Sequence, residues 1–166
     1  KNRQIDAFLG YWKPAMVPVV EPFVRDGHVE VLDTPNLSGA RHTLAVPRHL
    51  YDKGLKTFAD IARFEKALEG RIHGIEAGSE ANAPIRRMIR DNRFGLGGFT
   101  LVESSEAAML TQVQHASRSR KAIVFLGWEP HPMNVQLKMQ YLGGGDDVFG
   151  PDDGAARVYT VLARGY

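Results

Sequence analysis

The segment Ala122–Asn134, AIVFLGWEPHPMN, constrains the fold of this chain more than any other. Residues 123–126 form a continuous apolar run, which is typical of a strand buried on both faces of a mostly parallel sheet. Gly127 ends the run, and Trp128 follows where parallel strands present ligand-contacting residues. The segment IDAFLGYWKP near the start repeats the order of apolar residues, Gly, Trp (here Trp12) and Pro. Two indoles at strand ends fit a site for a large cation, because aromatic faces attract ammonium groups; the same spacing also fits ordinary core aromatics.

Six segments carry a resemblance to a known family, because they occur in the same order as in that family. They are FLGYWKP (8–14), NLSGARHTLAVP (36–47), GLKTFADIARF (54–64), VESSEAAMLTQV (102–113), FLGWEPHPMN (125–134) and GGDDVFGP (144–151). The chain resembles the substrate-binding proteins of choline and glycine-betaine ABC importers, with the stronger resemblance to the choline-preferring branch. The resemblance implies a protein that is not an enzyme and needs no cofactor or metal. It would capture choline, betaine or a related quaternary ammonium compound in the periplasm or another extracytoplasmic space and deliver it to a membrane permease.

The resemblance also implies an α/β fold of the periplasmic-binding-protein type II class, with a mostly parallel sheet flanked by helices. One lobe would be complete and the other partial. Residues 1–41 would be the end of the first lobe, 42–134 the second lobe, and 135–166 the return into the first. On this interpretation the chain is a fragment that lacks the N-terminal part of the first lobe and a C-terminal stretch. The unpaired first-lobe edges of such a fragment favour a homodimer.

Apolar periodicity independently predicts strands that alternate with helices, as in a sheet built from right-handed crossovers. The expected strands are 5–9, 28–32, 43–46, 72–75, 100–103, 123–126 and 157–162, and the expected helices are 15–24, 57–69, 81–91 and 106–117. Thr57 is expected to be the N-cap of the second helix, and the Ser104-Ser105 pair to cap the fourth. The Gly- and Asp-rich residues 143–154 are expected to form a loop.

The ligand that the resemblance implies explains the residues of the candidate site. A trimethylammonium group offers no N–H donor, so family members hold it in a box of Trp and Tyr faces. By motif, Trp12 and Trp128 are two cage residues, and His42 stands in place of the family's cage Tyr. Protonation of His42 would place a like charge beside the ligand, so affinity is expected to fall as the pH drops through the His42 pKa between pH 8 and 5.5. Packing of His42 at the start of a strand is the alternative.

Ser79 and Glu80 stand where family members typically have an Asn-Asp pair at the head of a helix. The resemblance implies that this pair orients the polar end of the ligand. The helix N-terminus would still supply N–H donors to an anionic or hydroxyl group. Ser79 fits equally well as a plain N-cap.

Other functions find no matching pattern in the sequence. The net charge of +2, with scattered Lys and Arg, argues against a nucleic-acid partner, and the absence of Cys excludes thiolate sites. The six His form no zinc motif, although Glu129-Pro130-His131 comes nearest to a ligand cluster. No nucleophile elbow or phosphate-binding loop is present either. The alternative that stays open is a fragment that keeps the family fold but binds no solute and self-associates.

Overall fold

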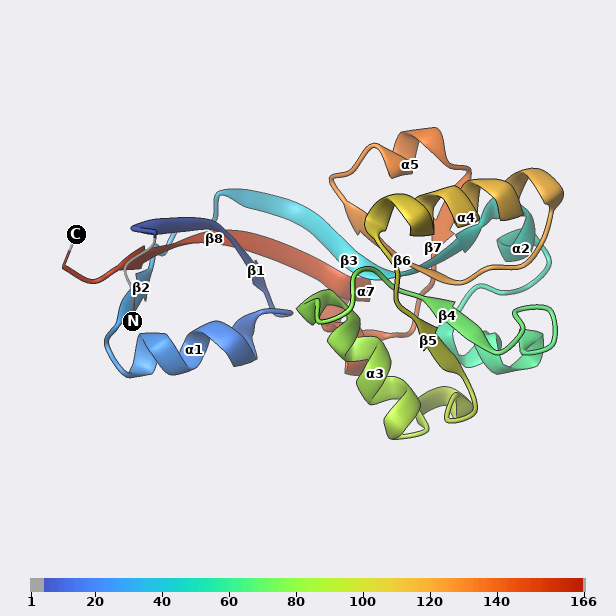
Figure 1. Ribbon diagram of the computed structural model, residues 1–166, viewed down its shortest axis with the longest axis horizontal. Helices are drawn as coiled ribbons and strands as arrows, with labels where there is room; N and C mark the ends of the chain where they lie inside the picture. The colour runs from blue at the N-terminus through green and yellow to red at the C-terminus, as the bar shows by residue number, and fades with distance from the viewer. Residues whose placement is uncertain (1–4, 166) are drawn as a thin grey trace. The chain divides into compact units, whose positions relative to one another are not determined.

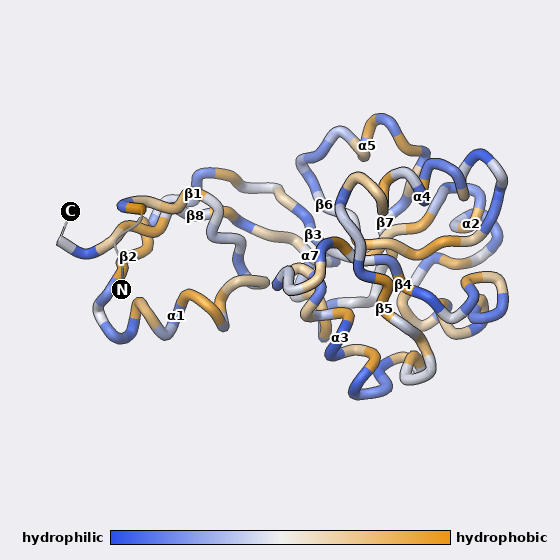
Figure 2. The backbone as a smooth tube through the Cα atoms, in the orientation of Figure 1, coloured by the Kyte–Doolittle hydropathy of each residue, from blue (hydrophilic) through white to orange (hydrophobic). Residues whose placement is uncertain are grey.

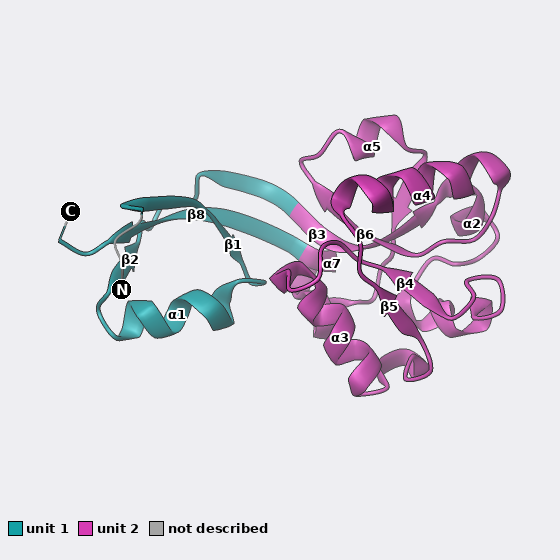
Figure 3. Ribbon diagram, viewed as in Figure 1, with its two compact units in different colours: residues 1–40, 155–166 teal, residues 41–154 magenta. Residues whose placement is uncertain are grey.

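The computed structural model describes residues 5–165, which divide into two compact units (Figures 1 and 3). Unit 1 contains residues 1–40 and 155–166, and unit 2 contains residues 41–154. The outer ends of the predicted lobe segments 1–41 and 135–166 therefore lie outside the described residues. The assignment of 1–41, 42–134 and 135–166 to lobes concerns the architecture of the longer family members, and it stays a prediction.

Unit 2 is built on a mixed sheet. Strand β6 (Phe125–Glu129) pairs antiparallel with β3 (Leu37–Pro47) and parallel with β4 (Arg71–His73), and β4 pairs parallel with β5 (Thr100–Val102). Strand β7 (Met139–Tyr141) pairs antiparallel with the end of β3. The α/β class is confirmed, but the expectation of a mostly parallel sheet is wrong. Parallel strands need crossover connections, and helices α3 and α4 supply them only between β4, β5 and β6.

Helices cover both faces of this sheet (Figure 1). On one face lie α4 (Glu106–Ser119) and α5 (Met133–Gln136); on the other lie the short 3₁₀ helix η1 (Phe58–Phe64) and α3 (Ala83–Arg90). The remaining helical segments of unit 2 are α2 (Arg48–Asp52), η2 (Glu80–Asn82), η3 (Arg93–Gly95), α6 (Asp146–Phe149) and α7 (Pro151–Gly154).

The apolar run 123–126 lies between two hydrophobic clusters. Val124 and Leu126 belong to the cluster on the η1 and α3 side, whereas Ile123 and Phe125 belong to the cluster under α4. None of the four residues is more than 4% exposed. The predicted burial on both sides is confirmed, but the predicted strand 123–126 is shifted: β6 begins at Phe125 and continues through Gly127 and Trp128 to Glu129.

Unit 1 is a smaller antiparallel arrangement. Strand β8 (Ala155–Ala163) pairs antiparallel with both β1 (Ala7–Lys13) and β2 (Val29–Val31). Helix α1 (Val17–Arg25) connects β1 to β2 and has no buried residue. Unit 1 therefore leaves much apolar surface exposed.

Further sequence expectations need correction. The predicted helix 57–69 is the 3₁₀ helix η1 followed by turns, because Phe58 and Ile61 are both fully buried and lie on one side of a three-residue repeat. Its predicted N-cap is confirmed, since Thr57 and Asp60 form a capping box with Thr57 N donating to Asp60 Oδ2 at 2.9 Å. The predicted loop 143–154 contains α6 and α7, and β1 continues through Trp12 rather than ending at Leu9.

Within residues 5–165, no helix combines the length and apolar character needed to cross a membrane.

Candidate functional site

One edge of the unit 2 sheet gathers several residues that the sequence analysis singled out. Because β4, β5 and β6 run parallel, their carboxyl ends lie at the same edge, where β3 enters from the opposite direction. His42 on β3 is the direct partner of Trp128 on β6. Directly opposed residues place their side chains on one face of the sheet, so two of the predicted cage residues are brought together.

Trp128 is half-buried and is held on two sides. Its ring meets the imidazole of His131 edge to face, with centroids 5.1 Å apart and ring planes at 70°. Its backbone oxygen accepts a hydrogen bond from Asn134 Nδ2 at 2.8 Å, and Tyr141 Oη donates to Asn134 Oδ1 at 2.6 Å. Trp128 thus lies near the end of β6 with part of its surface exposed.

His42 is packed against the interior of unit 2. Its ring lies 5.5 Å from that of Phe149, and its Nε2 atom is buried without a hydrogen-bond partner. Burial lowers the pKa of His42 from 6.5 to about 4, because the imidazolium would lose its hydration. The packing alternative is therefore present in the structure, and a ligand role for His42 stays a prediction.

The low pKa of His42 changes the expected pH dependence. The ring is neutral between pH 8 and 5.5, so it adds no like charge beside a cation in that range. The expected loss of affinity over this interval is not supported by the structure, and a constant affinity there would not exclude His42 from the site.

Ser79 and Glu80 lie in the loop that follows β4. Ser79 Oγ accepts a hydrogen bond from Ala81 N at 3.2 Å and so caps η2, while Glu80 is exposed in the first turn of η2. The plain N-cap is thus present, and the proposed contacts of both residues with a ligand stay a prediction.

The loop after β4 is organised by a residue that sequence reasoning missed. Asn82 is fully buried; its Oδ1 accepts from Ile75 N at 2.9 Å and its Nδ2 donates to Ile75 O at 3.0 Å. Gly74 lies against the Asn82 amide, and a Cβ at position 74 would collide with it. The only available signal was a polar residue within the apolar start of the predicted helix 81–91.

Trp12, the other predicted cage indole, belongs to unit 1. It is half-buried on β1 opposite Val158 of β8. Its neighbour Tyr11 is fully buried, and Tyr11 Oη donates to Glu21 Oε1 at 3.1 Å. Tyr11 is therefore part of the packing of unit 1 and does not offer a second exposed aromatic face.

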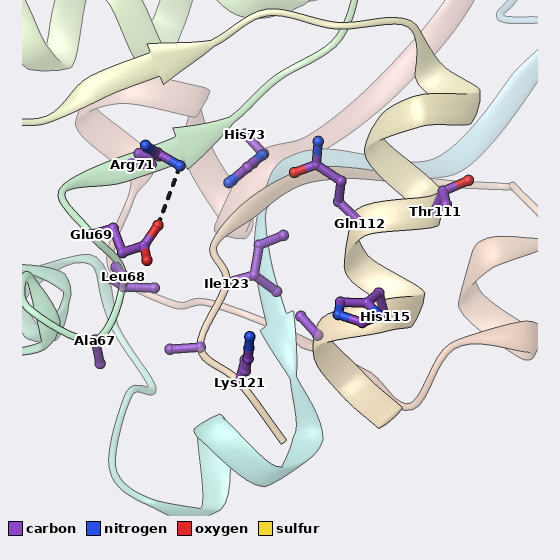
Figure 4. A pocket seen from close by; sticks show the side chains of 12 residues that line it. Ala67, Leu68, Glu69, Arg71, His73, Thr111, Gln112, His115, Lys121 and Ile123 are labelled. Carbon is purple, nitrogen blue, oxygen red and sulfur yellow. Dashed lines mark ion pairs between the residues drawn. The ribbon is translucent and has the colours of Figure 1, made fainter. Parts of the chain in front are cut away.

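A hollow of about 720 Å³ lies elsewhere in unit 2, between β4, the second half of α4 and the segment that leads into β6 (Figure 4). Its polar lining includes His73 and His115, and Arg71 pairs there with Glu69 at 3.2 Å. It contains none of the predicted site residues. Among residues 5–165, no group of three or more His, Asp or Glu side chains is arranged to hold a metal ion.

Comparison with known proteins places the chain in a family. Residues 1–166 match the family model described as the substrate binding domain of ABC-type glycine betaine transport system. A solved ABC-transporter choline binding protein in complex with choline is 49% identical, with a TM-score of 0.94; the match covers 100% of this chain and 57% of that chain. Lactococcal OpuAC, solved in its closed-liganded conformation with glycine betaine, is 25% identical with a TM-score of 0.82, over 98% of this chain and 59% of that chain.

A curated relative gives the same assignment. The glycine betaine/carnitine transport binding protein GbuC of Listeria monocytogenes is 30% identical over 94 residues, which are 57% of this chain and 30% of that protein. The chain thus spans between 30% and 59% of the length of these three relatives. The relatives are substrate-binding proteins of ABC transporters and not enzymes, which confirms that expectation. Because the family model matches from residue 1 to residue 166, the chain belongs to the family of substrate-binding domains of ABC-type glycine betaine transport systems.

Proposed function

We propose that this chain forms all or part of the solute-binding component of an ABC importer and captures choline or a related quaternary ammonium compound. The observation that carries the proposal is Trp128, a half-buried indole at the carboxyl edge of the parallel strands. The ligands named for its relatives, choline and glycine betaine, both carry a trimethylammonium group. An importer component of this kind works outside the cytoplasm and delivers its ligand to a membrane permease.

The binding chemistry follows from the ligand. Each aromatic face over a quaternary ammonium contributes about 0.5–2 kcal/mol, with the larger values in dry sites. Trp128 supplies one such face in the proposal, and His42 adds an uncharged ring above its pKa of about 4. Trp12 of unit 1 stays a predicted cage residue. Ser79 and Glu80, at the head of η2, contact the polar end of the ligand. The carboxylate of Glu80 favours the hydroxyl of choline over the carboxylate of betaine, because like charges repel.

Calorimetric titration of choline and of glycine betaine into the chain tests the proposal. We expect choline binding in the unchanged chain, weaker binding in Trp128→Phe, and none in Trp128→Ala. His115→Leu is the control, because His115 is an exposed residue of α4 that lines the hollow of Figure 4. Absence of heat with both ligands in the folded, unchanged chain would contradict the proposal.

A second candidate function, self-association, is favoured by the surface of unit 1. Ile5 and Leu9 are each 65% exposed and Phe23 is 52% exposed. Exposed apolar residues mark interaction surfaces where they gather into a contiguous patch. We propose that a second copy of this chain covers them. Sedimentation velocity over a wide concentration range tests this, and a monomer at every concentration would contradict it.

A further inference from the structure

His131 links Trp128 to a chain of hydrogen bonds that starts on helix α4. Its ring meets the indole of Trp128 edge to face at 5.1 Å, a geometry in which a positive ring edge meets a negative ring face. Its Nε2 atom lies 2.6 Å from Glu106 Oε1. The sequence analysis considered His131 only as a metal ligand, and the described residues hold no metal-binding group there.

The hydrogen bonds of His131 fix its tautomer. Met133 N–H donates to Nδ1 at 2.9 Å, so Nδ1 must be the acceptor and cannot carry a proton. The proton of the neutral ring is then on Nε2, which donates it to the carboxylate of Glu106. Both ring nitrogens are occupied, so the imidazole plane cannot turn without breaking a hydrogen bond.

Glu106 is itself held in place. Its backbone N–H donates to Glu76 Oε1 at 3.0 Å, which joins the start of α4 to the loop after β4. Ser105 caps the same helix, with its Oγ accepting from Ala108 N at 3.1 Å. The Glu106 carboxylate that accepts the hydrogen bond from His131 therefore lies at a helix end that other hydrogen bonds hold in place.

We infer that His131, locked by Glu106, is a positioning residue that holds the indole of Trp128 in one orientation. A ring that presents its face to a cation works only while that face stays directed at the ligand, and partners behind a contact residue supply such order. The effect on affinity rests on the proposed function, whereas the order of the indole does not. Simple packing of the turn 130–133 would stabilise the fold without restricting the indole.

Time-resolved fluorescence anisotropy of the ligand-free protein separates these two roles. The chain has two Trp, so Trp12→Phe leaves Trp128 as the single indole. In the Trp12→Phe background we expect fast motion of the Trp128 ring in His131→Leu and in Glu106→Ala. Glu106→Gln keeps a hydrogen-bond acceptor, so the motion of the ring should stay restricted in that variant. His115→Leu, on the same helix as Glu106, is the matched control. Restricted motion in both His131→Leu and Glu106→Ala, with the fold intact by circular dichroism, would overturn the inference.

Choline titrations in the chain with both Trp give the functional readout. We expect about tenfold weaker binding in His131→Leu, the scale of one aromatic pair, and binding within about twofold of the unchanged chain in Glu106→Gln. Unchanged affinity in a variant with a mobile indole would overturn the role in binding. If the unchanged chain binds no quaternary ammonium ligand, the proposed function fails, and the anisotropy alone decides whether His131 orders Trp128. Should His131→Leu not fold, His131→Gln, which removes the ring and keeps an N–H donor, replaces it with the same expectations.

Discussion

The two units of this chain differ in how much of their apolar surface they bury. Unit 2 encloses its large side chains, and Phe58, Ile85 and Leu126 are fully buried. Unit 1 has apolar residues along α1 (Figure 2), yet that helix has no buried residue. Unit 1 is also the smaller one, and the fraction of surface that a folded segment buries falls with its size, although Tyr11 and Val158 are buried there. Regular secondary structure therefore says little about whether a region is self-sufficient.

The same contrast applies to the two Trp that the sequence presents as equivalents. Both follow an apolar run and a Gly and precede a Pro. Trp128 meets the ring of His131 and has its backbone oxygen bound by Asn134. Trp12, in the smaller unit, lies beside the buried Tyr11, whose hydroxyl bonds to α1. The same sequence pattern therefore places one indole against a second ring, that of His131, and the other on a strand of a small antiparallel sheet.

The largest expected effect tests the difference in burial directly. Phe58→Ala in unit 2 should lower the free energy of unfolding by about 3–5 kcal/mol, because Phe58 is fully buried and packs at 5.5 Å from the ring of Phe94 and at 5.7 Å from that of Phe149. Phe23→Ala in unit 1 should change it by less than about 0.5 kcal/mol, because that ring is 52% exposed. Urea unfolding followed by circular dichroism measures both. Equal losses at a concentration at which the chain is monomeric would show that unit 1 itself buries Phe23 in solution.

The next effect concerns the buried imidazole of unit 2. The pKa of His42 is lowered to about 4 by burial, so the unfolded chain takes up a proton near pH 6.5 while the folded chain does not. Acidification between these values favours unfolding: the stability is fully present above pH 6.5 and falls by at most about 3 kcal/mol as the pH approaches 4.

Chemical unfolding at a series of pH values measures this dependence, and His42→Phe should make it shallower. His73, whose pKa is also lowered by burial, keeps part of it. The exposed His28 of unit 1 offers the matched control, His28→Gln. A pH profile that His42→Phe leaves unchanged would show that the His42 ring is hydrated in the folded protein.

The sequence predicted the parts of the molecule that depend on local pattern. The buried run 123–126, the α/β class and the cap at Thr57 follow from apolar periodicity and from hydrogen-bonding residues at helix starts. The direction of β3 relative to β6 could not be predicted in this way, because pairing is decided by contacts between residues far apart in the chain. The helix predicted over 57–69 failed for a related reason: the burial of both Phe58 and Ile61 favours a tighter turn than apolar spacing alone suggests.

The candidate site likewise contains some features that local sequence pattern predicts and others that depend on contacts between distant residues. The position of Trp128 at a strand end followed from the sequence, and its pairing with His42 became visible only with the register of β3 and β6. His131 and Glu106 are 25 residues apart, and no local pattern predicts their hydrogen bond. Asn82 was missed because a buried Asn is defined by the backbone groups around it, which a sequence does not display.

A smaller effect is expected at the start of η1. Thr57→Ala removes the hydroxyl that accepts from the backbone N–H of Asp60 in the capping box and donates to Asp60 Oδ2 at 2.9 Å. Loss of such a cap lowers the free energy of unfolding by about 1 kcal/mol. Thr57→Ser keeps the hydroxyl and should retain most of the stability. Urea unfolding compares the two variants. A loss in Thr57→Ser as large as that in Thr57→Ala would assign the effect to the methyl group and not to the cap.

The smallest effect on stability should accompany a clear effect on association. Leu9 and Phe23 of unit 1 are 65% and 52% exposed, so replacing both with Ser should alter the free energy of unfolding by less than about 0.5 kcal/mol per site. If a second copy covers this surface, the same variant should sediment as a monomer at concentrations where the unchanged chain dimerises, because it loses the apolar contact area. Val135, 91% exposed on α5 of unit 2, provides the control Val135→Ser, which should leave association unaltered. Dimers that persist in the Leu9→Ser/Phe23→Ser variant and dissociate in Val135→Ser would place the interface on unit 2 instead.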